Sequence, residues 1–178
     1  MRRPIMPRAA LLRLLLPCTL LCILPGTGGA HGTENGAETM NVHASLSVDA
    51  KHDKVLVTFR AENLSERRAW LPRTVAADQA LTGRLFDLRE HPGGAEVAYT
   101  GPWVKRGPMT AADFVELAPH SAHTHTIDIT DAYDFKPGQH SYEIRYEGGA
   151  LPDVRQLDAT RAIEAAPVVF SHTAPPGP

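Results

Sequence analysis

Apolar residues recur at every second position through most of this chain, and turn-forming residues interrupt the alternation at short intervals. This period of two is typical of strands that bury one face, because successive side chains of a strand point to opposite sides. Residues 41–50 alternate in this way, and so do residues 54–63. Since DAKHD supplies turn residues between them, the two segments are predicted to form a hairpin.

Further strands are predicted along the rest of the chain. Their ranges are 69–72, 97–101, 113–117, 123–130 and 141–148, with a last strand that begins at Ala166. The segment 83–89 leaves open which face is buried, because Leu85 differs in parity from Phe86 and Leu88. Residues 153–165 fit either a strand or a short helix. Seven to nine short strands without a helical period predict an antiparallel immunoglobulin-like β-sandwich, with a small barrel as the alternative.

The first thirty residues have the features of a secretory signal peptide. Arg2, Arg3 and Arg8 give a positive start, a leucine-rich run follows, and small residues lead to Ala30. An uncleaved membrane anchor is the alternative, but the apolar run is shorter than the roughly 20 residues of a span. We therefore expect residues 1–30 to be removed and the protein to be periplasmic or secreted.

Removal of this leader changes both the cysteine content and the charge. Cys18 and Cys22 both lie within it, so the exported chain is expected to fold without disulfides. The leader also holds four arginines and no acidic residue, which leaves 14 basic and 20 acidic residues and a net charge of −6. This balance does not favour nucleic acid or an anionic membrane as a partner. Residues 31–40 are expected to be a flexible N-terminus, 41–171 the sandwich and 172–178 a disordered tail.

The chain lacks the usual signatures of enzymes. It contains no H-E-x-x-H pair for zinc hydrolysis, no G-x-S-x-G nucleophile turn and no phosphate-binding glycine loop. The expectation is therefore a protein without catalytic activity.

Histidines are the one group of candidate ligands. His123 and His125 share a face of their predicted strand about 7 Å apart, and His31 would begin the exported chain after cleavage. Neutral imidazoles bind zinc and copper well. The alternatives are a periplasmic copper or zinc site, which would be the protein's only cofactor, and histidines that are simply solvated.

The sequence Asn63-Leu64-Ser65 matches the acceptor pattern for N-glycosylation. It also reads as an ordinary turn at the end of a strand. We expect the asparagine to be unmodified.

A long crossover, YTGPWVKRGPMTAADFVELAPHS, occupies residues 99–121. Tyr99, Trp103 and Phe114 are expected to anchor it in the core, while its prolines reduce the freedom of the unfolded chain. Lys105 and Arg106 would then project from a stiffened loop. Together with Trp103 they are the candidate contacts for a protein partner, although the two cations could equally serve solubility alone.

The order of motifs in residues 41–147 resembles the non-catalytic immunoglobulin-like domain of bacterial deuterolysin-type (peptidyl-Lys) metalloendopeptidases. That domain carries a Tyr-x-Gly turn, a Lys-Arg step, a Pro-Thr-x-x-Asp-aromatic element, a Leu-x-Pro-Gly corner and a Tyr-Asp-Phe turn. The matching residues here are Tyr99, Gly101, Lys105, Arg106, Pro108, Thr110, Asp113, Phe114, Leu117, Pro119, Asp128, Tyr133, Asp134 and Phe135. Tyr133 is expected to bond to backbone, as a corner tyrosine does.

The chain departs from that pattern in two places. His120 stands where the family has the corner glycine, and only 29 residues follow Gly149, so the zinc protease domain has no counterpart here. The resemblance therefore implies a fold and no catalytic or metal-binding residue. The opening strand, asparagine and turn are also similar to those of bacterial intracellular proteinase inhibitors. The expected function is binding of another protein, with a secreted metalloprotease as a candidate partner for a propeptide-like chaperone or inhibitor.

Overall fold

The computed structural model describes residues 40–51 and 53–176. The predicted signal peptide and most of the expected flexible N-terminus, including His31, lie outside these ranges. Within them, no helix is long and apolar enough to cross a membrane.

Strands dominate the described part of the chain, and the helices are single short turns. The strands are β1 (Val42–Lys51), β2 (Lys54–Asn63), β3 (Ala69–Pro72), β4 (Asp87–Glu90), β5 (Phe114–Leu117), β6 (Ala122–Asp128), β7 (Gly138–Ala150) and β8 (Arg161–Ala174). The helical turns are α1 (Arg73–Ala76) and the 3₁₀ turn η1 (Ala111–Asp113). The predicted all-β class is confirmed.

Six strands form one sheet in the order β4-β7-β8-β1-β2-β6, and β3 and β5 form a second, smaller sheet. The predicted hairpin of β1 and β2 is confirmed, with pairs running from Val42–Asn63 to Lys51–Lys54. All pairings are antiparallel except that of β1 with β8, which is parallel and is carried by the pair Ala44–Ala165.

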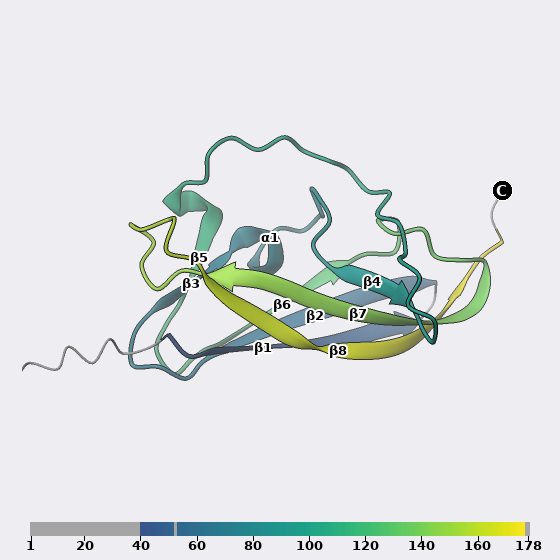
Figure 1. Cartoon of the computed structure of the whole chain (residues 1–178), viewed down its shortest axis with the longest axis horizontal. Helices are drawn as coiled ribbons and strands as arrows, with labels where there is room; N and C mark the ends of the chain where they lie inside the picture. The colour runs from purple at the N-terminus through teal and green to yellow at the C-terminus, as the bar shows by residue number, and fades with distance from the viewer. Residues whose placement is uncertain (1–39, 52, 177–178) are drawn as a thin grey trace, which may run out of the picture. The chain divides into compact units, whose positions relative to one another are not determined.

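The large sheet is strongly curved. The rings of Phe59 in β2 and Tyr146 in β7 meet edge to face with centroids 5.1 Å apart. In a flat sheet, the three strand intervals between β2 and β7 would separate them by about 14 Å. The sheet must therefore curve strongly enough to bring β7 near β2, and in Figure 1 β4, β7 and β8 are drawn nearer the viewer than β1 and β2. This contact supports a sandwich, and the immunoglobulin-like assignment stays a prediction.

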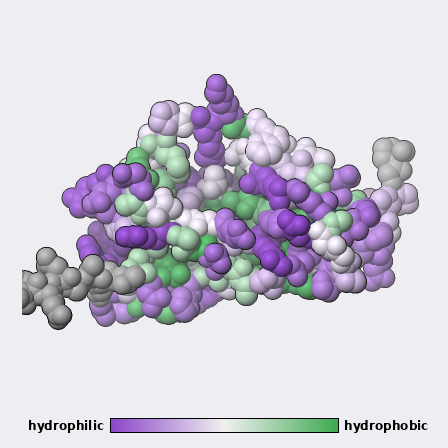
Figure 2. All heavy atoms as spheres, viewed as in Figure 1, coloured by the Kyte–Doolittle hydropathy of each residue, from purple (hydrophilic) through white to green (hydrophobic). Residues whose placement is uncertain are grey.

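The core lies between these two groups of strands. Alternate residues of β2 are fully buried as predicted, and so are the inward residues of β7. The largest fully buried side chains are Tyr142, Phe59, Phe86, Leu71, Leu88, Ile127, Ile129, Ile144, Leu151, Val55, Val57 and Val75. Many outward positions are polar, and the face in Figure 2 is mostly hydrophilic with smaller hydrophobic patches.

Three expectations about elements need correction or completion. Residues 97–101 contain one isolated bridge, from Tyr99 to Tyr133, rather than the predicted strand. Strand β8 includes 161–165, which decides the helix-or-strand question for that part, and it continues to Ala174. The first three residues of the expected disordered tail therefore belong to the sheet. Phe86 and Leu88 are buried and Leu85 is only half-buried, so Phe86 and Leu88 face the core.

Candidate functional site

The first part of the crossover, residues 99–110, begins with Tyr99, whose side chain lies against Gly101. The Tyr99 hydroxyl donates to the Pro102 carbonyl at 2.9 Å. A Cβ atom at Gly101 would lie 2.7 Å from that hydroxyl oxygen, which is too close for any other residue. The Tyr99 ring also meets the rings of Tyr133 and Trp103 edge to face, both with centroids 5.4 Å apart. The Tyr-x-Gly sequence is therefore a local packing unit.

Backbone hydrogen bonds fix the start of the crossover to neighbouring loops. The N–H groups of Thr100 and Gly101 both donate to the Ala132 carbonyl, at 2.9 and 3.2 Å. Further along, the Val104 N–H donates to the Thr82 carbonyl at 3.0 Å. These bonds hold the chain on both sides of Trp103.

A short polar motif follows this first part of the crossover. The Asp113 carboxylate accepts from the Thr110 N–H at 2.8 Å and from its hydroxyl at 2.9 Å. These bonds lower the pKa of Asp113, because they stabilise its ionised form. The Thr-x-x-Asp element thus closes the turn that leads through η1 into β5.

Trp103 is not a core anchor, so this expectation is wrong. Its side chain is 74% exposed, and one edge of its ring rests near Gly83, where a Cβ atom would lie 3.7 Å away. Tyr99 and Phe114 are half-buried, and they pack as partial anchors. Val104 and Met109 are also large, apolar and more than half exposed. The crossover therefore presents apolar side chains to solvent.

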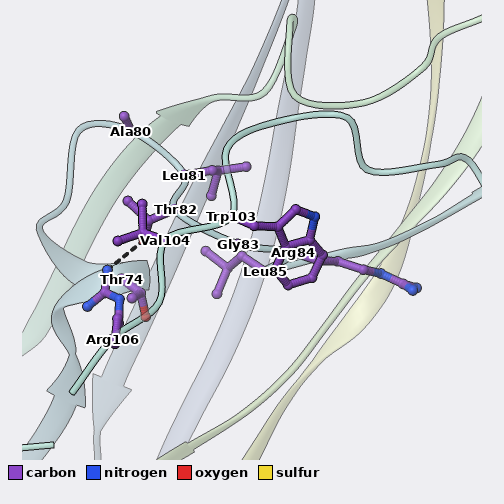
Figure 3. Close-up of a pocket in the computed structure, with 10 residues that line it drawn as sticks. All are labelled: Thr74, Ala80, Leu81, Thr82, Gly83, Arg84, Leu85, Trp103, Val104 and Arg106. Atoms are coloured by element: carbon purple, nitrogen blue, oxygen red, sulfur yellow. Dashed lines mark hydrogen bonds between the residues drawn. The ribbon is translucent and has the colours of Figure 1, made fainter. Parts of the chain in front are cut away.

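A cavity of ≈ 320 Å³ lies beside Trp103, between the loop 80–85 and residues 103–106 (Figure 3). Leu81, Leu85 and Val104 give it apolar walls, and Arg84 and Arg106 line it with cations. None of its ten lining residues is acidic.

The two candidate cations differ in their contacts. One terminal nitrogen of Arg106 bonds to the Thr82 hydroxyl at 2.6 Å (Figure 3). The same nitrogen lies 3.2 Å from the Asp78 carboxylate, so this side chain is held in place. Lys105 forms no ion pair with any described residue, and it is exposed. Trp103 and Arg106 therefore line the same cavity, and Lys105 is exposed and lies between them in the chain.

Tyr133 packs against Tyr99 at the start of the crossover. Its buried hydroxyl accepts from the Phe86 N–H at 3.1 Å and donates to the Phe86 carbonyl at 2.9 Å. Burial raises the pKa of Tyr133 to about 12. The expected bond to backbone is confirmed, but its partner is 47 residues away rather than in the local corner.

His123 and His125 do share one face of β6, as predicted. The Nε2 atom of His123 lies 2.6 Å from the Ala76 carbonyl and that of His125 lies 3.0 Å from the Asp78 carbonyl. A carbonyl only accepts, so each Nε2 carries the proton, and the two rings bind the last residue of α1 and a residue just after it. Residues 40–51 and 53–176 contain no group of three or more His, Cys, Asp or Glu side chains arranged to hold a metal ion. His31 lies outside the described residues, and the metal site stays a prediction.

Asn63 is fully buried at the end of β2. Its amide nitrogen donates to the carbonyls of Arg67, Leu117 and Ala118 at 2.7–3.2 Å, while its oxygen accepts from the N–H and hydroxyl of Ser65. The interpretation of this motif as a strand-ending turn is confirmed. The buried amide is unavailable to a glycosylating enzyme in the folded protein.

His120 has a φ of +50°. This is the left-handed region that glycine adopts most easily. Its Nε2 lies 2.9 Å from a Glu66 carboxylate oxygen. His120 therefore adopts a backbone conformation that glycine would favour.

Comparison with protein-family models and with curated proteins found no match. Among solved structures, the chain is similar to the X-ray structure of Northeast Structural Genomics Consortium target SoR45. The match has 15% identity and a TM-score of 0.36, and it covers 79% of this chain and 88% of that one.

Proposed function

We propose that this chain is an exported, non-enzymatic β-sandwich protein that binds another protein. Its binding region is the crossover surface, defined as Trp103, Val104, Lys105, Arg106 and Met109. The observation that carries the proposal is an exposed tryptophan held in place by its neighbours.

The distribution of exposed apolar residues favours this region. Single exposed hydrophobic residues are normal on proteins, but contiguous ones point to interaction sites. Five large hydrophobic side chains are clearly exposed in the described residues, and three of them, Trp103, Val104 and Met109, fall within seven positions of the crossover. Tryptophan and arginine are also the residues most enriched among those that dominate binding energy.

The packing beneath the crossover surface further supports binding. Tyr99, Gly101 and Val104 fix the backbone around Trp103 through the contacts described above. A surface that is ordered before binding loses less conformational entropy when a partner arrives. The crossover therefore has the properties of a preorganised contact site.

The resemblance to the accessory domain of deuterolysin-type metalloendopeptidases suggests the partner. Several residues that carry this resemblance make defined contacts here. The Tyr99 ring lies against Gly101. The Asp113 carboxylate accepts from Thr110, and the Tyr133 hydroxyl donates to the Phe86 carbonyl. We propose an exported metalloprotease as the partner, with this chain as its chaperone or inhibitor.

Capture from the secreted and periplasmic fractions of the source organism tests the proposal. The immobilised wild-type protein should retain one partner, and Trp103→Ala should weaken its retention by about 30-fold, the effect of losing a dominant contact of roughly 2 kcal/mol. Val169→Ala is the matched control, because Val169 is also an exposed apolar residue but lies on β8. Equal retention by the wild type and Trp103→Ala would contradict the proposal.

A further inference from the structure

The cavity beside Trp103 has a size and lining that restrict what it can receive. Its volume of ≈ 320 Å³ is at the small end of the roughly 300–1,000 Å³ typical of ligand sites. Apolar walls from Leu81, Leu85 and Val104 suit an aliphatic or aromatic group. These features fit one side chain of a partner better than a large cofactor.

Both charged residues that line the cavity are cations, although acidic side chains pair with each of them from outside the lining. Arg84 and Arg106 are the charged groups among its lining residues, and Lys105 follows directly in the chain. Asp87 and Glu96 pair with Arg84, and Asp78 pairs with Arg106, whereas Lys105 has no ion-pair partner among the described residues. Acidic groups beside an incoming apolar side chain would therefore be attracted here, and basic groups would be repelled.

The cations retain the capacity to bind a carboxylate. Arg84 is already engaged by Asp87 and Glu96. Arg106, by contrast, contacts Asp78 and Thr82 through a single terminal nitrogen, although a guanidinium has five N–H donors. Lys105 has no ion-pair partner among the described residues. Arg106 and Lys105 are thus the groups that would meet the partner's acids.

We propose that the cavity receives an apolar side chain from an acidic segment of the partner protein, whose carboxylates pair with Lys105 and Arg106. This inference rests on the proposed function and specifies the chemistry of its partner. It requires Trp103 to flank the bound side chain, so the indole should report binding directly.

Fluorescence titration of the Trp70→Phe variant tests the inference, because Trp103 is then the only tryptophan. The probes are three capped pentapeptides: Glu-Asp-Leu-Asp-Glu, the same peptide with Ser in place of Leu, and Lys-Lys-Leu-Lys-Lys. The acidic leucine peptide should bind at least about tenfold more tightly than either other peptide and should shift the Trp103 emission. Its affinity should fall with added salt.

Charge reversal tests the role of the cations. Lys105→Glu should weaken binding of the acidic leucine peptide by about tenfold, while Lys51→Glu, an exposed lysine on β1, should leave it unchanged. Equal affinity for the three peptides, no saturable change in Trp103 emission, or an unaffected Lys105→Glu variant would each overturn the inference. Capture of a partner that depends on Trp103, without such discrimination among peptides, would overturn only this inference and leave the proposed function intact.

Discussion

The Tyr133 hydroxyl pairs with both backbone groups of Phe86, accepting from its N–H and donating to its carbonyl. Tyr133 precedes β7 and Phe86 precedes β4, so this pair joins two loops that are remote in the sequence. Since the Tyr133 ring also contacts Tyr99, the same side chain connects the core to the start of the crossover.

Tyr133→Phe should destabilise the fold more than loss of one ordinary hydrogen bond. The change leaves the buried N–H of Phe86 without a partner and its carbonyl with only a 3.5 Å bond from Arg84 Nε, at a cost of about 2–3 kcal/mol in the free energy of unfolding. Urea denaturation measures this cost. Tyr99→Phe is the control, because its hydroxyl is near solvent, and it should cost under about 1.5 kcal/mol. Similar losses for both variants would contradict the account of Tyr133.

The tyrosines should make the fold sensitive to alkali. Burial raises the pKa of Tyr133 and of Tyr146 to about 12, and those of Tyr99 and Tyr142 are raised as well. An unfolded tyrosine ionises near pH 10, so the stabilising contribution is fully present below pH 10 and is lost as pH rises toward 12. It amounts to roughly 2–3 kcal/mol for each of Tyr133 and Tyr146.

Absorbance at the phenolate band and circular dichroism, followed together from neutral to alkaline pH, check this expectation. Ionisation of the buried tyrosines should coincide with loss of the β signal above pH 11. Complete ionisation near pH 10 in a protein that keeps its native spectrum would show that these phenols are not buried.

Asn63→Ala should be among the most damaging single changes in the turn after β2. The amide donates to three carbonyls and accepts two bonds from Ser65. Removing it therefore leaves several buried groups without hydrogen-bond partners. We expect a loss of roughly 3 kcal/mol or more by urea denaturation. The neighbouring Leu64→Ala change at an exposed position should cost less than about 1 kcal/mol. A tolerated Asn63→Ala change would contradict the structural role.

Gly101→Ala should disturb Tyr99 and, through it, Trp103. The new methyl group would overlap the Tyr99 ring, which must move away from the Pro102 carbonyl at a cost of roughly 1–3 kcal/mol. The near-ultraviolet circular dichroism of the aromatic cluster should weaken. Gly107→Ala in the same crossover is the matched control, because no atom lies near its added Cβ, and its effect should stay within about 0.5 kcal/mol. An unchanged spectrum for Gly101→Ala would disprove the close contact.

The strands were largely predictable because their signal is local. The alternation through Val55, Val57 and Phe59 directly reflects the two faces of β2, and DAKHD marks its hairpin with β1. Residues 97–101 misled the prediction, since their apolar alternation serves loop packing against Tyr133 rather than a ladder of strand pairs. Residues 172–174 were assigned to the disordered tail, but they pair with β7 as part of β8.

The candidate site was less predictable because it depends on contacts between distant loops. Sequence reasoning identified Trp103, Lys105 and Arg106, but it expected the tryptophan to be inside. No local signal tells that Gly83 faces the indole or that Thr82 holds both the Val104 N–H and Arg106. Likewise, His123 and His125 were recognised as a pair on one face, whereas their carbonyl partners come from the chain around α1.

Site-specific photocrosslinking tests the central claim of protein binding most directly. Benzoylphenylalanine is placed at position 103 in one variant and at position 169, an exposed apolar site on β8, in another. After irradiation in the exported fraction of the source organism, the account predicts one dominant covalent adduct from position 103 and none from position 169. No adduct at 103, or the same adducts from both positions, would contradict it.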